Sequence, residues 1–122
     1  MKWNFDNDRA IYSQIIEHMK NFIVSNEVTA GEKLPSVREL ASQAGVNPNT
    51  MQRALSELES AGLVYSNRTS GRFITEDENI IHNLKTEIAN KNIQSFLINM
   101  EKIGYGKEET IVLIKNFKEG VN

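Results

Sequence analysis

The sequence contains no cysteine among its 122 residues. A disulfide scaffold, a cysteine nucleophile and a thiolate zinc site are therefore excluded. Long apolar runs are also absent, and no stretch approaches the roughly 20 residues that a membrane-spanning helix needs. The first ten residues, MKWNFDNDRA, place no apolar run behind their one lysine, so they do not form a signal peptide. We expect a cytoplasmic protein without a membrane partner.

Catalytic motifs are missing as well. The two histidines, His18 and His82, lie far apart in the chain, and each falls in a segment with helical spacing. No phosphate-binding loop, nucleophile motif or cluster of metal-ligand residues is visible. We therefore expect no enzymatic activity, no cofactor and no metal site.

The chain also lacks an excess of positive charge, because 14 basic residues face 16 acidic ones. Contacts to DNA phosphates need lysine and arginine, so where the basic residues lie matters more for DNA binding than the net charge of the chain. Residues 33–75 carry five basic and three acidic residues. This small local excess predicts weak non-specific DNA binding, and an affinity that depends on dimerisation.

Two short helices with strong end signals lie in the middle of the chain. Ser36 and Glu39 form a capping box after Pro35, and Gly45 provides a left-handed stop. Asn47 then caps a second helix that has Pro48 at its first position. Residues 11–24 precede this pair with one apolar face and a cap predicted at Asp8. A capped helix, a turn with glycine and a second capped helix are typical of a helix-turn-helix.

A hairpin follows the second helix. Residues 63–65 and 73–75 are β-prone, and residues 67–71 between them have the composition of a hairpin loop. A hairpin at this place is the wing of a winged helix-turn-helix. The predicted fold class is mainly α with a small β-hairpin, a winged helix-turn-helix domain followed by a two-helix C-terminal dimerisation segment.

The second helix has a polar face suited to the edges of DNA bases. If Met51, Leu55 and Leu58 are buried, the opposite face carries Asn49, Gln52, Arg53 and Ser56. Asparagine and glutamine pair with adenine and arginine with guanine in the major groove. Arg38 on the preceding helix is a further predicted DNA contact, although it could instead form a surface ion pair. Arg68 and Arg72 beside the hairpin loop are also predicted DNA contacts, at the adjacent minor groove or backbone. Gly71 is expected to supply a positive φ in the turn.

The order of these motifs closely resembles the GntR family of bacterial repressors. The matching segments are EKLPSVRELA at 32–41, GVNPNT at 45–50 and RALSELE at 53–59. The turn at 46–50 resembles the YtrA subfamily in particular. The resemblance implies a homodimer on a palindromic DNA operator, with DNA contacts from Ser36, Arg38, Asn49, Thr50, Gln52, Arg53 and the wing at Gly71. Thr69 stands where the family often has the first wing glycine, and Ala10 where it often has proline.

Residues 77–122 have the length of a two-helix tail, and the resemblance assigns such a tail to the dimer interface. Asn90 to Asn92 interrupt its apolar stripe and shift its phase, which predicts a bend or a stutter. An exposed apolar stripe needs a partner surface, so we expect the interface to contain Ile81, Leu84, Ile88, Phe96, Leu97, Met100, Ile111 and Ile114.

The predicted domains are thus a DNA-binding domain at 1–76 and a dimerisation tail at 77–122. We expect the protein to be a transcriptional repressor. The resemblance implies the target, since YtrA-like proteins often control ABC-transporter operons. With no separate ligand domain, a small-molecule effector would act at the dimer interface or in a cleft between tail and wing. The alternative is a winged helix that binds another protein instead of DNA, which the mild acidity of the chain favours.

Overall fold

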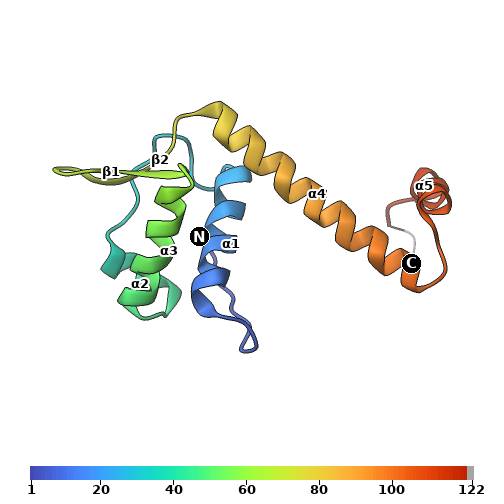
Figure 1. The fold of residues 1–122 in the computed structure, drawn as a ribbon, viewed down its shortest axis with the longest axis horizontal. Coiled ribbons are helices and arrows are strands. Elements are labelled where there is room, and N and C mark those ends of the chain that lie inside the picture. The colour runs from blue at the N-terminus through green and yellow to red at the C-terminus, as the bar shows by residue number, and fades with distance from the viewer. Residues whose placement is uncertain (121–122) are drawn as a thin grey trace. The chain divides into compact units, whose positions relative to one another are not determined.

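The computed structural model describes residues 1–120 and contains five helices and one hairpin (Figure 1). The helices are α1 (Ile11–Val24), α2 (Val37–Ala44), α3 (Pro48–Ser60), α4 (Glu78–Lys102) and α5 (Lys107–Asn116), and the strands are β1 (Val64–Asn67) and β2 (Gly71–Ile74). The chain forms two compact units, residues 1–85 and 86–122. The first unit extends to Lys85, beyond the predicted boundary at residue 76. No helix within residues 1–120 is long and apolar enough to cross a membrane.

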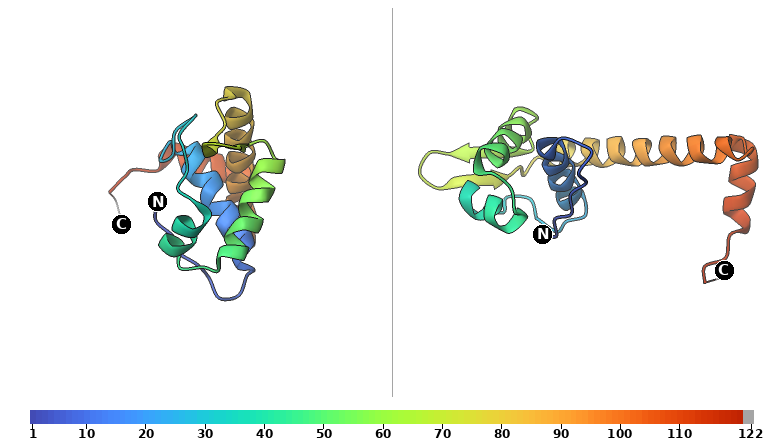
Figure 2. Two further views of the ribbon diagram at one scale, coloured as in Figure 1. Left: turned by 90° about the vertical axis from the view of Figure 1, so that its left-hand side faces the viewer. Right: turned by 90° about the horizontal axis from the view of Figure 1, so that it is seen from below.

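The first unit is a winged helix-turn-helix. In Figure 1 and Figure 2, α1 and α3 lie side by side, with α2 packed against α3. Each helix buries one face in a shared core, which α1 supplies with Ile15, Met19, Phe22 and Ile23, α2 with Leu40 and Ala41, α3 with Met51, Ala54, Leu55 and Leu58, and the hairpin with Val64 and Ile74. This core fixes which face of α3 remains in solvent.

Local signals set the ends of both helices in the helix-turn-helix. The capping box of Ser36 and Glu39 is formed, Gly45 ends α2 with φ 71° and ψ 35°, and Asn47 caps α3 with Pro48 at its first position. α3 ends at a glycine as well: Ala61 is its right-handed C-cap residue, and Gly62 follows at φ 79°. Leu63 N–H then donates to the Leu58 carbonyl at 3.0 Å, the hydrogen bond of a glycine-terminated helix.

The start of α1 differs from the prediction. Asp8 does not cap it, because the N-cap residue is Ala10, which makes no side-chain hydrogen bond. The buried side chain of Gln14 instead satisfies the preceding backbone, accepting from Asp6 N–H at 2.7 Å and donating to the carbonyls of Asp6 and Arg9. The first ten residues are thereby held against α1.

The wing is a two-stranded hairpin that is bridged to the segment before α2. β1 and β2 pair antiparallel from Val64↔Ile74 to Asn67↔Gly71. On the other side of β2, Leu34 N–H donates to the Arg72 carbonyl and Ile74 N–H donates to the Glu32 carbonyl, each at 2.9 Å. The segment that leads into α2 is therefore hydrogen-bonded to the wing.

α4 is one continuous helix through Asn90 to Asn92. Its apolar residues form two stripes. At about 100° per residue, the stripe of Phe96, Leu97 and Met100 lies roughly 160° around the axis from that of Ile80, Ile81 and Leu84. Leu84 in the first stripe is buried within the first unit. The phase shift seen in the sequence therefore separates two packing surfaces on a regular helix.

Candidate DNA-binding surface

The N-terminus of α2 presents a hydroxyl group. The Ser36 hydroxyl oxygen accepts from Glu39 N–H at 3.2 Å, and the Glu39 carboxylate accepts from Ser36 N–H at 3.4 Å. This cap uses a lone pair of the hydroxyl oxygen, so its proton stays free to donate. Ser36 is exposed and could donate to a DNA phosphate without losing its cap.

The outer face of α3 carries most of the predicted base-reading residues. Asn49, Gln52 and Arg53 are exposed on the side opposite the core, whereas Thr50 is half-buried. The Asn47 side chain accepts from Asn49 N–H at 2.8 Å, which leaves the Asn49 amide group in solvent. Gln52 donates to the Ser56 hydroxyl at 3.3 Å, an exposed contact that water or a base edge can replace.

All five arginines of the chain lie within residues 1–85, and they differ in their partners. Arg9 is paired with Asp6 at 3.1 Å and Glu17 at 2.8 Å, and its hydrogen bonds to these two carboxylates raise its pKa. Within the described residues, Arg38, Arg53 and Arg68 are exposed and form no ion pair. The unpaired arginines are thus those of α2, α3 and the wing tip.

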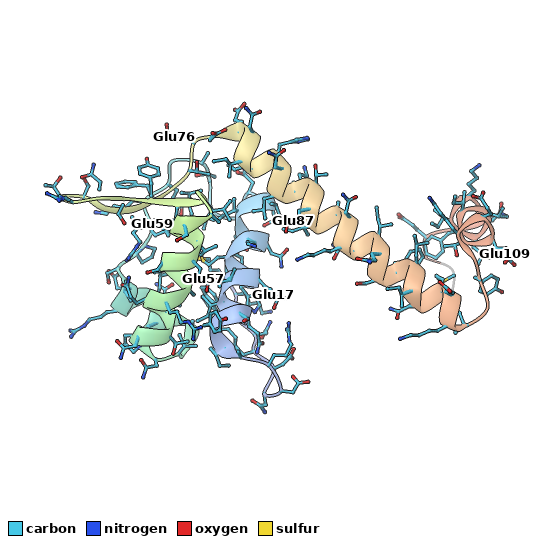
Figure 3. The ribbon with its side chains drawn as sticks, in the orientation of Figure 1. Glu17, Glu57, Glu59, Glu76, Glu87 and Glu109 are labelled. Carbon is cyan, nitrogen blue, oxygen red and sulfur yellow. The ribbon has the colours of Figure 1, made fainter. Side chains whose placement is uncertain are left out.

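Arg72, a predicted DNA contact, is paired with a carboxylate of α3. Its Nε lies 3.5 Å from Glu59 Oε1, and its side chain is 22% exposed. The same carboxylate oxygen accepts a hydrogen bond from the Ser66 hydroxyl. Figure 3 shows Glu59 near the end of α3 that faces the hairpin. Glu59 therefore ties the wing to α3, a role that the sequence did not reveal because it depends on the hairpin register.

A cleft of about 660 Å³ separates the wing from the start of α2. Ser36, Gly71 and Arg72, three predicted site residues, line it together with Lys33 and Ser70. Gly71 has φ 107°, and a Cβ there would lie 3.3 Å from Lys33 Cε. The fold therefore brings Lys33, which sequence reasoning counted only as a charge, to the same surface as the wing.

The second unit has an apolar groove of its own. It measures about 360 Å³ and is lined by Phe96, Met100, Thr110, Leu113, Ile114 and Phe117. Phe96, Met100 and Ile114 were predicted at the dimer interface, and Phe117 and Leu113 are exposed additions to that set. Leu97, Ile111, Ile81 and Ile88 are half-buried. Leu84 is only 5% exposed in one chain, so its side chain is not available to a second copy.

Known proteins show the same architecture. The model of bacterial regulatory proteins of the gntR family matches residues 11–74, from α1 to the end of β2. The chain is 41% identical to the HTH-type transcriptional regulator YhcF of Bacillus subtilis over 116 residues, which covers 95% of this chain and 96% of the relative. It is 45% identical to the HTH-type transcriptional repressor YtrA of Bacillus subtilis over 67 residues, 55% of this chain and 52% of that protein.

The similarity extends to solved structures. A GntR family transcriptional regulator from Listeria monocytogenes superposes with a TM-score of 0.84 at 40% identity, covering 93% of this chain and 100% of that one. Both the winged helix-turn-helix and the helical tail are therefore shared with a regulator of similar length. The chain belongs to the GntR family of transcriptional regulators, and its YtrA-like relatives and winged helix-turn-helix make it a DNA-binding regulator of that family.

Proposed function

We propose that the protein is a homodimeric repressor that reads a palindromic operator with the exposed faces of α2 and α3. The observation that carries this proposal is the placement of the unpaired arginines. Arg38 and Arg53 extend from the two helices of the helix-turn-helix without an acidic partner among the described residues, whereas Arg9 is paired with Asp6 and Glu17. A surface that binds an acidic or apolar protein would not need amide side chains beside these cations.

Each side chain has a distinct part in the proposal. Asn49, Gln52 and Arg53 face base edges in the major groove, because amides pair with adenine and guanidinium with guanine. Arg38 and the Ser36 hydroxyl bind phosphates, which fix the position of α3 on the duplex. Arg68 at the wing tip contacts the neighbouring backbone or minor groove. Arg72 supports the wing through Glu59.

Dimerisation supplies the affinity that one reading head lacks. The net charge of −2 limits the electrostatic part of DNA binding. The apolar groove of the tail exposes Phe96, Ile114 and Phe117. In the proposed dimer, this groove packs against the same groove of a second copy around a two-fold axis. Such a dimer places its two heads on half-sites about one DNA turn, roughly 34–36 Å, apart. By analogy with YtrA-like proteins, we propose that the target is an ABC-transporter operon.

The test is a gel shift with a duplex from the region upstream of the protein's own gene, measured from 50 to 200 mM salt. Binding should weaken steeply with salt, since phosphate contacts release counterions. Arg53→Ala should cost about 1–3 kcal/mol and relax the preference at one base pair, whereas Arg38→Ala should weaken all sequences alike. Arg9→Ala removes the same charge from a paired position and is the matched control.

Two results would contradict the proposal. Absence of salt-sensitive binding to any duplex selected from random DNA at micromolar protein would favour the protein-interaction alternative. Equal losses for Arg53→Ala and Arg9→Ala would show that α3 does not present Arg53 to the bases. Loss of repression of the neighbouring genes in a deletion strain tests the regulatory role separately.

A further inference from the structure

Arg53 is in contact with an aromatic ring of another helix. Its Cζ atom lies 3.8 Å from the ring centroid of Tyr12. Tyr12 is the second residue of α1, and Arg53 is in the second turn of α3. Because α1 and α3 pack side by side from the core outward (Figure 1), the position of the ring is set by that packing.

A guanidinium group over the face of a ring is attracted to the negative quadrupole of the π system. This contact uses the flat side of the group, so its five N–H donors, which point outward in the guanidinium plane, stay available. Within residues 1–120 the Arg53 side chain has no ion pair, and no hydrogen bond occupies its donors. The ring thus holds the group in place without occupying the donors that a base would use.

Holding the side chain matters because arginine has many rotamers. A free arginine loses rotamer freedom when it forms a bidentate pair with guanine, and that loss weakens binding. An arginine already stacked on a fixed ring has lost part of this freedom in the folded protein. Binding should then be tighter, and it should discriminate more sharply at the base pair that the guanidinium contacts.

We propose that Tyr12 is a positioning residue for operator recognition, which acts by holding the Arg53 guanidinium in its reading orientation. The inference rests on the proposed role of Arg53 at a base edge. It assigns α1, which otherwise contributes to the core, a part in sequence specificity. The opposite role, in which Tyr12 holds Arg53 away from the DNA, predicts a change of opposite sign in the same measurement.

The experiment compares Tyr12→Phe, Tyr12→Leu and Tyr12→Met in the full chain, each with its melting temperature measured first. The probes are the selected operator and its single-base variants. Tyr12→Phe keeps the aromatic face and should bind like the unchanged protein. Tyr12→Leu should weaken binding about two- to fivefold per half-site, the effect of an exposed cation–π pair. The two aliphatic replacements provide independent tests if one of them folds poorly.

A double-mutant cycle separates positioning from packing. In the Arg53→Ala background, Tyr12→Leu should cause no further loss, because the group that Tyr12 positions is gone. Tyr12→Leu alone should flatten discrimination at the same base pair as Arg53→Ala and nowhere else. A general packing defect would weaken binding to every sequence and would persist in the Arg53→Ala background.

The outcomes distinguish the inference from the proposed function. If Arg53→Ala weakens operator binding but Tyr12→Leu leaves it unchanged or strengthens it, the inference is overturned and the reading role of Arg53 stands. If Arg53→Ala has no effect, both are overturned. Equal losses for Tyr12→Phe and Tyr12→Leu would also refute the inference, since phenylalanine retains the ring face.

Discussion

Replacing Phe96 with alanine should weaken the proposed dimer much more than the same change at Ile98. The two side chains lie on α4 with similar exposure, 43% for Phe96 and 46% for Ile98. At about 100° per residue they are roughly 160° apart around the helix. Phe96 lines the apolar groove with α5, and Ile98 does not. Ile98→Ala is therefore a control of matched exposure on the same helix.

The size of the effect follows from the exposed fraction. Complete burial of a phenylalanine side chain stabilises by about 1.5–3 kcal/mol. Covering the 43% that is exposed in one chain would contribute about 0.6–1.3 kcal/mol. In a two-fold interface each substitution counts twice, so Phe96→Ala should cost about 1.3–2.6 kcal/mol. This corresponds to an increase of about ten- to eightyfold in the dimer dissociation constant.

Sedimentation equilibrium over a range of protein concentrations measures that constant directly, with circular dichroism to confirm that the tail stays helical. Phe96→Ala should shift the monomer–dimer transition to higher concentration, and Ile98→Ala should leave it within about twofold of the unchanged protein. The same Phe96 variant should lose operator affinity, because two heads no longer bind together. A tight dimer for Phe96→Ala, or equal weakening by Ile98→Ala, would refute the groove as the interface.

Three further predictions concern the domain boundary, the α2 cap and the start of α1. A chain ending after Lys85 keeps the whole first unit and should be a folded monomer with much weaker operator binding; a tight dimer in sedimentation would contradict this. Ser36→Ala should reduce the free energy of unfolding by about 0.5–2 kcal/mol, because the helix loses its cap. Ser36→Asp should keep that stability but weaken DNA binding, because its carboxylate repels the phosphates. Equal DNA affinity for the unchanged protein and Ser36→Asp would show that Ser36 makes no phosphate contact. Ala10 has φ −57°, an angle that proline also adopts. Ala10→Pro should therefore raise the free energy of unfolding by about 0.4–1 kcal/mol, measured by thermal or urea unfolding. A loss of stability would show that the segment before α1 cannot accept the proline ring.

Features governed by neighbouring residues could be predicted from the sequence. Ser36 with Glu39, and Asn47 with Pro48, act within three residues of each other, and each forms the predicted helix end. The exposed face of α3 followed from the spacing of Met51, Leu55 and Leu58, which are all buried. Short-range chemistry therefore predicts both the helix-turn-helix and the exposed face of α3.

Features that depend on distant partners could not be predicted. The ion pair of Arg72 with Glu59 was not predicted, because Glu59 is brought to Arg72 only by the turn after α3 and the hairpin register. Asp8 looked like a cap, but the buried Gln14 takes over the backbone groups before α1. Leu84 shares the apolar character of the tail, and only the fold shows that the first unit buries it.

The pairing of residues 31–34 with β2 has a consequence for the operator itself. Gly31 and Leu34 donate backbone hydrogen bonds to the carbonyls of Ile74 and Arg72, each at 2.9 Å. These hydrogen bonds join the wing to the segment that leads into α2, and they limit the gap between the proposed DNA contacts of the wing and of α2. A duplex whose groove width does not match that gap has to bend or twist to fit. Base pairs that the protein never touches should therefore affect affinity through their deformability.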